Sequence, residues 1–438
     1  MASSLQFLLF SSLLFLSLSY AQRSSRPNAL VLPVSKDAST LQYLTKINQR
    51  TPLVPVTLVV DLGGRFLWVD CENNYVSSTY RTPGCNSDKC SISRFAAVCG
   101  GCFPSPRPAG SPCMRNRCIL SADNSVTRTA NDGELLEDVV SVQSTDGSNP
   151  GPAATVSKFL FSCAPTSLLK GLAGGATGMA GLGRSQISLP SQFASSFSFP
   201  RKFAVCLSSG TGVIFFGDAP YKLRPNIDPS DSLTYTPLFI NPVSTSSGYL
   251  LGESSVEYFI GVTSIKITDK VVPLNTSLLS IDAEGYGGTK ISTVNPYTVM
   301  ESSIYKAFTE AFINEATARN ITRAPSVAPF DVCFSTNNVG STRLGPGVPF
   351  IELILQSQSV VWRITGSNSM VYVSDNVLCL GFVDGGLNPR TAIVIGGYQL
   401  EDNFLQFDLE GSRLGFSYSL LGRRTTCGNF NFTSSSIP

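Results

Sequence analysis

The chain has 438 residues and a formal net charge of +2, and only 14% of its residues are charged, against about 25% in an average globular protein. That length suits two or three domain-sized units, and the near-neutral charge gives no indication of nucleic-acid binding. Histidine is absent, which excludes Ser-His-Asp and Cys-His catalysis as well as histidine-ligated zinc. We therefore expect a β-rich protein with neither a metal ion nor another cofactor.

The first 21 residues are uncharged and largely apolar. Between Leu5 and Leu18 apolar side chains alternate with a few serines, and Ser19-Tyr20-Ala21 offers a small residue at a cleavage site. The apolar part is shorter than the roughly 20 residues that a membrane-spanning helix needs. We predict that residues 1–21 are a signal peptide and that the mature protein is secreted and is not embedded in a membrane.

Short β-type runs separated by turn residues dominate the rest of the sequence. The clearest runs are Pro55–Asp61, Glu137–Val142, Phe203–Leu207, Val213–Phe216, Tyr258–Ile267 and Val371–Val373. Helical periodicity is clear only from Ser302 to Glu315, where a serine is expected to cap the start. The sequence therefore predicts a mainly β fold with a few short helices.

Twelve cysteines, an even number, all follow Ala21. Seven of them lie between Cys71 and Cys118, a density that would suggest a metal site in a cytosolic protein. The predicted signal peptide and the absence of histidine favour six disulfide bridges instead, although spacing alone does not select the pairs. N-glycosylation is expected at the sequons that begin at Asn275, Asn320 and Asn431.

Asp61 ends a predicted strand and begins the segment Asp61-Leu62-Gly63-Gly64. This segment resembles the Asp-Thr/Ser-Gly-Ser/Thr motif of pepsin-like aspartic proteases, in which each of two lobes supplies one catalytic Asp. Leu62 and Gly64 replace the two hydroxyl residues, so the hydrogen bonds that orient the carboxylates are expected to be weakened. By itself, Asp-x-Gly is also common in polar turns, which is the structural interpretation of Asp61.

The second copy of the motif is identified at Ile291-Ser292-Thr293-Val294, where Ser292 stands in the place of the second Asp. Peptide hydrolysis by this family needs two carboxylates that share a proton. The flap tyrosine of the family also falls at a serine, Ser121. We therefore treat Asp61 and Ser292 as vestigial positions and predict that the protein is not an enzyme.

Further segments follow in the order in which pepsin-like proteins have them. They are 177–183 with 188–192, 393–397, 404–409 and 413–416. The resemblance runs from about Val31 to Phe416 and implies a bilobal fold with two related β lobes around a central cleft. A polar, Pro-rich stretch at 221–232 suggests the boundary. We expect residues 22–230 to form the N-terminal lobe with its cysteine-rich insert, and residues 231–438 to form the C-terminal lobe.

The motif variants at 60–64 and 291–297, the cysteine-rich insert and the C-terminal segment 423–433 are similar to one plant group of inactive pepsin-like proteins. It comprises extracellular dermal glycoproteins, xylanase-inhibitor-like proteins and basic 7S globulins. This resemblance implies a monomeric defence protein of the apoplast that inhibits a microbial glycoside hydrolase, with a xyloglucan-specific endo-β-glucanase as the favoured target. The alternative is a basic 7S globulin-like binding or storage protein for peptide or carbohydrate ligands.

The resemblance places two inhibitory residues on loops, Arg343 in 342–347 and Arg424 in 421–427. An arginine can form bidentate, charge-assisted hydrogen bonds with the two carboxylates of a glycosidase cleft, and it stays charged at every relevant pH. Arg423 is an extra charge beside Arg424. The alternative interpretation is that both arginines are ordinary solvated surface residues.

The resemblance also implies the disulfide pairing. The pairs are Cys71 with Cys163, Cys85 with Cys90, Cys99 with Cys118, Cys102 with Cys113, Cys206 with Cys427 and Cys333 with Cys379. The last two would brace the neighbourhoods of Arg424 and Arg343, respectively.

Overall fold

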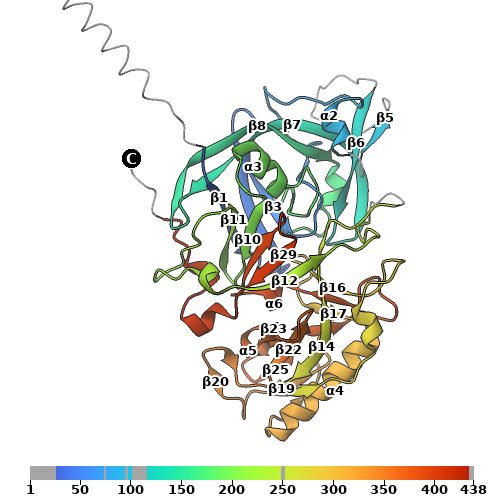
Figure 1. The fold of residues 1–438 in the computed structure, drawn as a ribbon, viewed down its shortest axis with the longest axis vertical. Coiled ribbons are helices and arrows are strands. Elements are labelled where there is room, and N and C mark those ends of the chain that lie inside the picture. The colour runs from blue at the N-terminus through green and yellow to red at the C-terminus, as the bar shows by residue number, and fades with distance from the viewer. Residues whose placement is uncertain (1–25, 74, 94–96, 101–115, 248–251, 434–438) are drawn as a thin grey trace, which may run out of the picture.

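The computed structural model describes residues 26–73, 75–93, 97–100, 116–247 and 252–433. Within these residues the chain forms mainly β-strands with a few helices, arranged in two lobes that lie one above the other in Figure 1. The first half of the chain, blue to green, forms the upper lobe, and most of the second half, yellow to red, forms the lower one. The expected all-β class is confirmed, while the expected signal peptide lies outside the described residues.

The elements of the first half wind around one extended sheet. They are β1 (Ala29–Lys36), β2 (Tyr43–Gln49), β3 (Val54–Asp61), β4 (Trp68–Asp70), α2 (Asp88–Ser91), β5 (Ala97–Gly100), β6 (Arg117–Asn124), β7 (Thr129–Thr145), β8 (Pro150–Ala164), η1 (Thr166–Leu169), β9 (Gly178–Gly181), α3 (Leu189–Phe197), β10 (Lys202–Cys206), β11 (Thr211–Gly217) and η2 (Pro229–Ser232). β7 and β8 form a long antiparallel ribbon, and β6 and β7 form the hairpin that projects over the cleft.

The second half begins with β12 (Thr234–Phe239), β13 (Tyr258–Ile260), β14 (Val262–Ile267), β15 (Lys270–Val271), η3 (Thr276–Leu279), β16 (Thr289–Ile291), β17 (Thr298–Met300), α4 (Ser302–Ala318), β18 (Arg323–Ala324) and β19 (Cys333–Ser335). It continues with β20 (Ser341–Thr342), β21 (Gly345–Pro346), β22 (Ile351–Leu355), β23 (Val361–Ile364), α5 (Gly366–Ser369), β24 (Met370–Ser374), β25 (Val377–Leu380) and β26 (Phe382–Asp384). The last elements are β27 (Ile393–Ile395), α6 (Gly397–Leu400), β28 (Phe404–Asp408), β29 (Arg413–Phe416), η4 (Leu420–Arg423) and η5 (Cys427–Asn429).

The two halves are joined through the large sheet. β10 of the first half pairs antiparallel with β28 of the second half, and β28 also pairs with β29, so the last strands of the chain lie beside a strand of the first half. Phe203 of β10 stacks on Phe407 of β28 with their ring centroids 4.8 Å apart, and both are fully buried. Burial of such a side chain stabilises the fold by about 1.5–3 kcal/mol, so this layer holds the lobes together. The lobe boundary between residues 230 and 231 stays a prediction.

Most predicted elements are present, with two local differences. The run 258–267 is interrupted at Gly261, where a Cβ would lie 2.5 Å from the Gln356 side-chain oxygen, so it forms two strands, β13 and β14. The expected serine cap of α4 is wrong, because the cap is Glu301, whose carboxylate accepts hydrogen bonds from the backbone N–H groups of Ser303 and Ile304. A carboxylate at this end of a helix also complements the helix dipole.

Each lobe contains one ψ-shaped loop around a short strand. In the first lobe β9 lies between β3, to which it is parallel, and β4, to which it is antiparallel. In the second lobe β27 lies between β16 and β17 with the same directions. Asp61 is the last residue of β3, and Ser292 directly follows β16, so the two positions are equivalent in the two loops.

Three disulfides agree with the expected pairs: Cys71–Cys163, Cys206–Cys427 and Cys333–Cys379. The expected pairs Cys85–Cys90 and Cys99–Cys118 are wrong, because the structure joins Cys85 to Cys99 and Cys90 to Cys118. α2 places Cys90 in the same buried cluster as Cys118, whereas Cys99 is exposed at its strand. The expected pair Cys102–Cys113 lies outside the described residues.

Candidate functional site

Asp61 lies at the floor of the cleft between the lobes, and its side chain is 5% exposed. One carboxylate oxygen accepts a hydrogen bond from the Ser125 hydroxyl at 2.6 Å, and the other accepts one from the Gly63 N–H at 3.0 Å. Burial raises the pKa of Asp61 to about 6, although these two hydrogen bonds oppose the shift. Ser125 comes from the turn between β6 and β7, where the motif analysis had not identified a functional residue.

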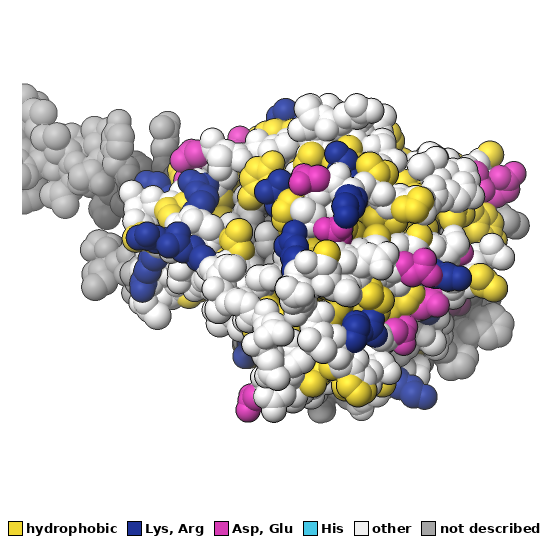
Figure 2. Space-filling model, turned by 90° about the horizontal axis from the view of Figure 1, so that it is seen from below, with side chains coloured by type: hydrophobic (Ala, Val, Ile, Leu, Met, Phe, Trp, Pro, Cys, Tyr) yellow, Lys and Arg dark blue, Asp and Glu magenta, His cyan; other side chains and the backbone are white. Residues whose placement is uncertain are grey.

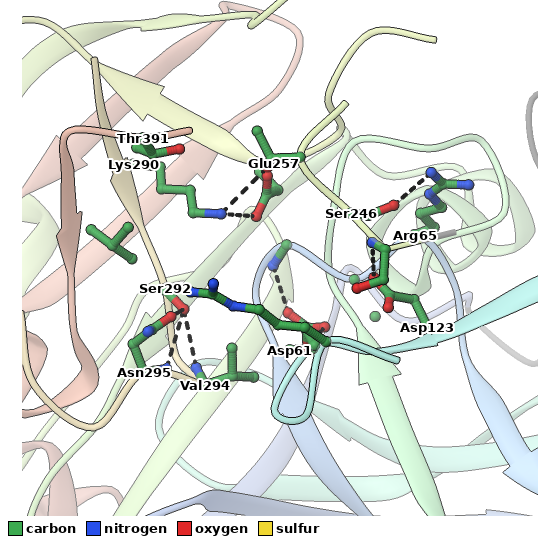
Figure 3. A pocket seen from close by; sticks show the side chains of 18 of the residues that line it. Asp61, Arg65, Asp123, Ser246, Glu257, Lys290, Ser292, Val294, Asn295 and Thr391 are labelled. Atoms are coloured by element: carbon green, nitrogen blue, oxygen red, sulfur yellow. Dashed lines mark hydrogen bonds and ion pairs between the residues drawn. The ribbon is translucent and has the colours of Figure 1, made fainter. Parts of the chain in front are cut away.

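Ser292 faces the same cavity from the second lobe (Figure 3). Its hydroxyl donates to the Asn295 side-chain oxygen at 2.9 Å and accepts from the backbone N–H groups of Val294 and Asn295, each at 3.3 Å. These contacts lie within its own turn. The position thus carries a hydroxyl that is engaged locally, and Asp61 has no second carboxylate in the place where a protease would need one.

One hydrogen-bonded connection across the two ψ-loops remains. The Thr293 hydroxyl accepts from the Leu62 N–H at 3.0 Å and donates to the Val60 carbonyl at 2.7 Å, and it is buried. Leu62 has no hydroxyl with which to return the contact. Thr293 was not identified from the sequence, although it occupies the hydroxyl position of the second motif.

The cleft encloses a cavity of about 290 Å³, and two of the cationic side chains that line it are paired with carboxylates. Lys290 Nζ lies 2.7 Å from the Glu257 carboxylate, and the Arg65 guanidinium lies 2.9 Å from the Glu253 carboxylate, with side-chain exposures of 5% and 4% for the second pair. Arg65 also donates to the Ser246 hydroxyl at 2.6 Å. Figure 3 shows the Lys290 and Arg65 contacts on opposite sides of Asp61.

Residues 241–247 and 252–257 of the second half contact the first lobe at the cleft. The Ser247 N–H donates to the Asp123 carboxylate of β6 at 3.3 Å, and burial raises the pKa of Asp123. The Glu257 side chain lies so near the turn after Asp61 that a Cβ at Gly63 would be 2.8 Å from its Cγ. Polar contacts within the protein therefore line this side of the cleft.

Arg343 lies at the tip of the hairpin formed by β20 and β21. The Thr342 hydroxyl donates to the Gly345 carbonyl at 2.7 Å and accepts from the Leu344 N–H at 3.1 Å, which fixes the turn. Gly345 has φ +90°, and a Cβ there would lie 2.2 Å from the Ser367 backbone nitrogen, so only glycine fits this close approach. Arg343 itself is exposed.

Arg424 directly follows η4 and is also exposed. Its φ is +59°, a left-handed conformation that is uncommon for residues other than glycine and is found at functional sites. The Arg424 N–H donates to the Leu421 carbonyl at 3.1 Å, and the next residue, Thr425, donates its hydroxyl to the Arg224 carbonyl. The Cys206–Cys427 disulfide anchors the segment three residues further on.

The two loops lie side by side although they are far apart in the sequence. A Cβ at Gly422 would be 3.6 Å from Leu344 Cδ2, an ordinary van der Waals contact between the Arg343 hairpin and η4. Within the part of the chain that the structure describes, the guanidinium groups of Arg343 and Arg424 make no hydrogen bond or ion pair. Arg423 differs, because it donates to the Ser232 hydroxyl at 3.0 Å. Figure 2 shows the lower end of the molecule, where Lys and Arg side chains lie in separate groups on the surface.

Two family models match the chain, "Xylanase inhibitor N-terminal" over residues 43–218 and "Xylanase inhibitor C-terminal" over residues 257–418. Probable aspartic proteinase GIP2 of Nicotiana benthamiana is 61% identical over 99% of this chain and 100% of its own. The chain belongs to the xylanase-inhibitor-like group of inactive pepsin-like proteins.

Other members of the xylanase-inhibitor-like group agree with this assignment. Basic 7S globulin of Glycine max is 40% identical over 99% of this chain and 100% of its own. The crystal structure of edgp superposes with a TM-score of 0.91 at 66% identity, covering 94% of this chain and all of that one. An aspartic proteinase from Irpex lacteus, with a TM-score of 0.55 and 15% identity over 91% of this chain and 99% of its own, shows the pepsin-like fold alone.

The sequons of this xylanase-inhibitor-like chain differ in accessibility. Asn275 and Asn320 are exposed, whereas Asn431 is half-buried and its amide nitrogen donates to the Asn149 side-chain oxygen at 3.1 Å. Glycosylation at all three asparagines stays a prediction. Within the described ranges, no group of three or more Cys, Asp or Glu side chains is arranged to hold a metal ion, and no helix has the length and apolar character needed to cross a membrane.

Proposed function

We propose that the protein is a secreted inhibitor of microbial cell-wall-degrading glycoside hydrolases, with a xyloglucan-specific endo-β-glucanase as its favoured target. Arg343 and Arg424 would enter the active-site cleft of the enzyme and bind its catalytic carboxylates. One observation carries the proposal: two exposed arginines without recorded partners stand on adjacent loops that are each fixed by internal contacts. Membership of the xylanase-inhibitor-like group supports the general class of partner.

The chemistry of the target suits two neighbouring guanidinium groups. Glycosidases carry a pair of carboxyl groups about 5–5.5 Å apart in retaining enzymes and about 6.5–9.5 Å apart in inverting ones. A guanidinium donates two parallel N–H bonds to a carboxylate, and in a cleft from which water is excluded such bonds are stronger than at a surface. Two arginines from adjacent loops can therefore bind the two catalytic carboxylates of one enzyme.

The fixed loops reduce the entropic cost of binding. Ordering a free, rotamer-rich side chain at an interface costs roughly 0.5–1.5 kcal/mol, and ordering its loop costs more. The hairpin bonds around Arg343 and the disulfide three residues after Arg424 provide this order before the target arrives. The Cys333–Cys379 bridge joins β19 and β25 and braces the same lobe.

A peptidase activity is disfavoured by the cleft. Asp61 and Ser292 line the same cavity, Ser292 stands in place of a second carboxylate, and the Glu257 side chain occupies space next to Gly63. We expect no cleavage of denatured protein between pH 3 and pH 5 and no binding of pepstatin. Cleavage that disappears in Asp61→Asn would contradict this and would return the protein to the protease class.

The second candidate is a binding or storage role like that suggested for basic 7S globulins. The 40% identity to the Glycine max globulin over nearly the whole chain favours it, and the 290 Å³ cavity offers a place for a small ligand. This alternative gives Arg343 and Arg424 no role in binding. It would be preferred if no glycosidase is inhibited at all.

The deciding experiment is a titration of a purified xyloglucan-specific endoglucanase with the mature, glycosylated protein. We expect stoichiometric inhibition of this enzyme and none of an unrelated cellulase. Arg424→Ala and Arg343→Ala should each weaken inhibition by about 2 kcal/mol or more, a loss of roughly thirtyfold, because a buried carboxylate would lose its partner.

Arg423→Ala is the matched control, since Arg423 is adjacent, equally charged and already bonded to Ser232. Its effect should stay within about threefold, a difference of roughly 0.7 kcal/mol. Equal losses for Arg423→Ala and Arg424→Ala would mean that only net charge matters. Full inhibition by Arg424→Ala would remove that residue from the mechanism.

A further inference from the structure

Asp402 contacts both ends of the segment that carries Arg424. Its backbone carbonyl accepts a hydrogen bond from the Leu420 N–H at 2.8 Å, and its carboxylate accepts one from the Cys427 N–H at 2.9 Å. Asp402 is held in turn by its own N–H, which donates to the Leu207 carbonyl at 2.7 Å. A single residue between α6 and β28 therefore fixes the start and the finish of the segment Leu420–Cys427.

Side chains of the segment also bond to residues 224–232, because Thr425 donates its hydroxyl to the Arg224 carbonyl and Arg423 donates to the Ser232 hydroxyl, but these bonds do not hold the backbone at its two ends. The Thr425 N–H donates to the Leu420 carbonyl at 3.2 Å, which closes the loop on itself, and Cys427 is bonded to Cys206. The disulfide restrains the position of Cys427, but a bond between two side chains leaves the direction of the backbone free. The Asp402 carboxylate fixes the direction of the backbone, because its hydrogen bond to the Cys427 N–H orients the peptide group between Thr426 and Cys427.

We propose that Asp402 is a positioning residue that clamps the Leu420–Cys427 segment and so holds Arg424 in the orientation required for target binding. This inference rests on the proposed inhibitory function of Arg424. It assigns a role to a side chain that lies outside both the vestigial cleft and the arginine loops.

The backbone of Asp402 limits which variants can test this role. Its φ is +51°, in the left-handed region that asparagine, aspartate and glycine tolerate better than other residues. Asp402→Asn keeps a side-chain acceptor of the same shape, and Asp402→Gly removes the acceptor. Both avoid the backbone strain that alanine would add, so a comparison of the two isolates the hydrogen bond.

The clamp is expected to depend on pH. Burial raises the pKa of Asp402 to about 6, the Cys427 N–H opposes that shift, and the neighbouring Glu401 charge adds to it. Glu401 is itself paired with Lys36 at 2.7 Å and accepts from the Tyr43 hydroxyl.

The Tyr398 ring lies beside Lys36, and the charged residues on the segment itself are Arg423, whose guanidinium bonds to Ser232, and the exposed Arg424. An ionised carboxylate accepts a hydrogen bond more strongly than a protonated one, so Asp402 should hold the segment more firmly above pH 6 than below it.

The test compares wild-type protein, Asp402→Asn and Asp402→Gly in the endoglucanase titration at pH 5 and pH 7.5. At pH 7.5 we expect Asp402→Gly to inhibit roughly tenfold more weakly than wild type, the equivalent of about 1.4 kcal/mol, with Asp402→Asn between them. At pH 5 wild type and Asp402→Asn should become equal. The two proteins are compared by the ratio of their inhibition constants at each pH. Any titration of the target enzyme affects both constants alike and so does not change the ratio.

Hydrogen exchange of the Cys427 amide, measured on the inhibitor alone, separates this inference from the proposed function. Faster exchange at Cys427 and Arg424 in Asp402→Gly, with β22 amides unchanged, supports the clamp even if no glycosidase is inhibited. Unchanged exchange, or equal inhibition by all three proteins at pH 7.5, would overturn it. If Asp402→Gly does not fold, the comparison of wild type with Asp402→Asn still tests the clamp. A ratio of their inhibition constants that is the same at both pH values would overturn the proposal.

Discussion

The vestigial cleft and the arginine loops are both rich in polar side chains, but they differ in how those side chains are satisfied. In the cleft, Arg65 is paired with Glu253 and Lys290 with Glu257 inside the protein. Arg343 and Arg424 are exposed and have no recorded partner among the described residues. A charge that is already paired and buried has little binding energy to offer, because a ligand would first have to break that pair. This difference supports the proposal that the loops bind the partner and that the cleft contributes to stability.

Removing Glu253 should give the largest loss in the free energy of unfolding. It should destabilise the cleft without changing the structure of the arginine loops. Glu253→Ala leaves the Arg65 guanidinium, whose side chain is 5% exposed, without its carboxylate. Breaking a buried pair in this way costs about 3–5 kcal/mol, so a large loss in denaturant-unfolding free energy is expected. Inhibition by the fraction that stays folded should be unchanged.

Glu310→Ala provides the control, since Glu310 is an exposed residue of α4 in a position where substitution should be nearly neutral. A loss of inhibition in folded Glu253→Ala would show that the cleft contributes to target binding. A loss of stability as small as that of Glu310→Ala would show that the Arg65 pair is not what closes the cleft.

The sequence predicted the cleft better than it predicted the loops. Asp61 and Ser292 could be placed because each follows an apolar strand in a local motif, and the structure puts both in equivalent ψ-loops. The contact between Leu344 and Gly422 joins positions 78 residues apart, and no local pattern indicates such a pairing.

The cysteine-rich insert was mispaired for a related reason. The structure joins Cys85 to Cys99 and Cys90 to Cys118, and spacing alone does not select these pairs over Cys85–Cys90 and Cys99–Cys118. Thr293 was not predicted because its partners, the Leu62 N–H and the Val60 carbonyl, lie far from it in the sequence. In each case the unpredicted feature depends on a partner that is distant in the chain.

Neutralising Asp61 should stabilise the protein. This would support the interpretation of the cleft as a structural rather than a catalytic site. The pKa of Asp61 is raised from 3.8 to about 6 by burial, so the folded state resists ionisation more than the unfolded state does. The contribution of Asp61 to stability is therefore most favourable below pH 4 and is lost as the pH rises through 6. The full penalty at pH 7 is at most about 3 kcal/mol.

We expect Asp61→Asn to be more stable than wild type by about 2 kcal/mol at pH 7 and equally stable at pH 3.5. Thermal melting at the two pH values measures this difference. Inhibition of the endoglucanase should not change. A destabilised Asp61→Asn at pH 7 would mean that the carboxylate is held by the Ser125 and Gly63 bonds more strongly than burial opposes it.

The smallest effect is expected at the remaining link between the two ψ-loops. Thr293→Val keeps the shape of the side chain but leaves the buried Leu62 N–H without its acceptor. An unsatisfied buried donor costs about 1–3 kcal/mol, and the matching valine methyl recovers part of the packing, so a loss of about 1 kcal/mol is expected in urea unfolding.

Thr317→Val is the control for Thr293→Val, because Thr317 is exposed on α4 and its hydroxyl bonds only to the preceding turn. If Thr293→Val costs no more than Thr317→Val, the cross-lobe bond does not contribute to stability, and other contacts, such as those of residues 241–247 and 252–257, hold the lobes together at the cleft. If it costs more while inhibition is unchanged, one half of an ancestral catalytic scaffold has been kept for stability after its chemistry was lost. In that case the two loops that carry Arg343 and Arg424 can change their target without disturbing the cleft, since no described hydrogen bond joins the two regions.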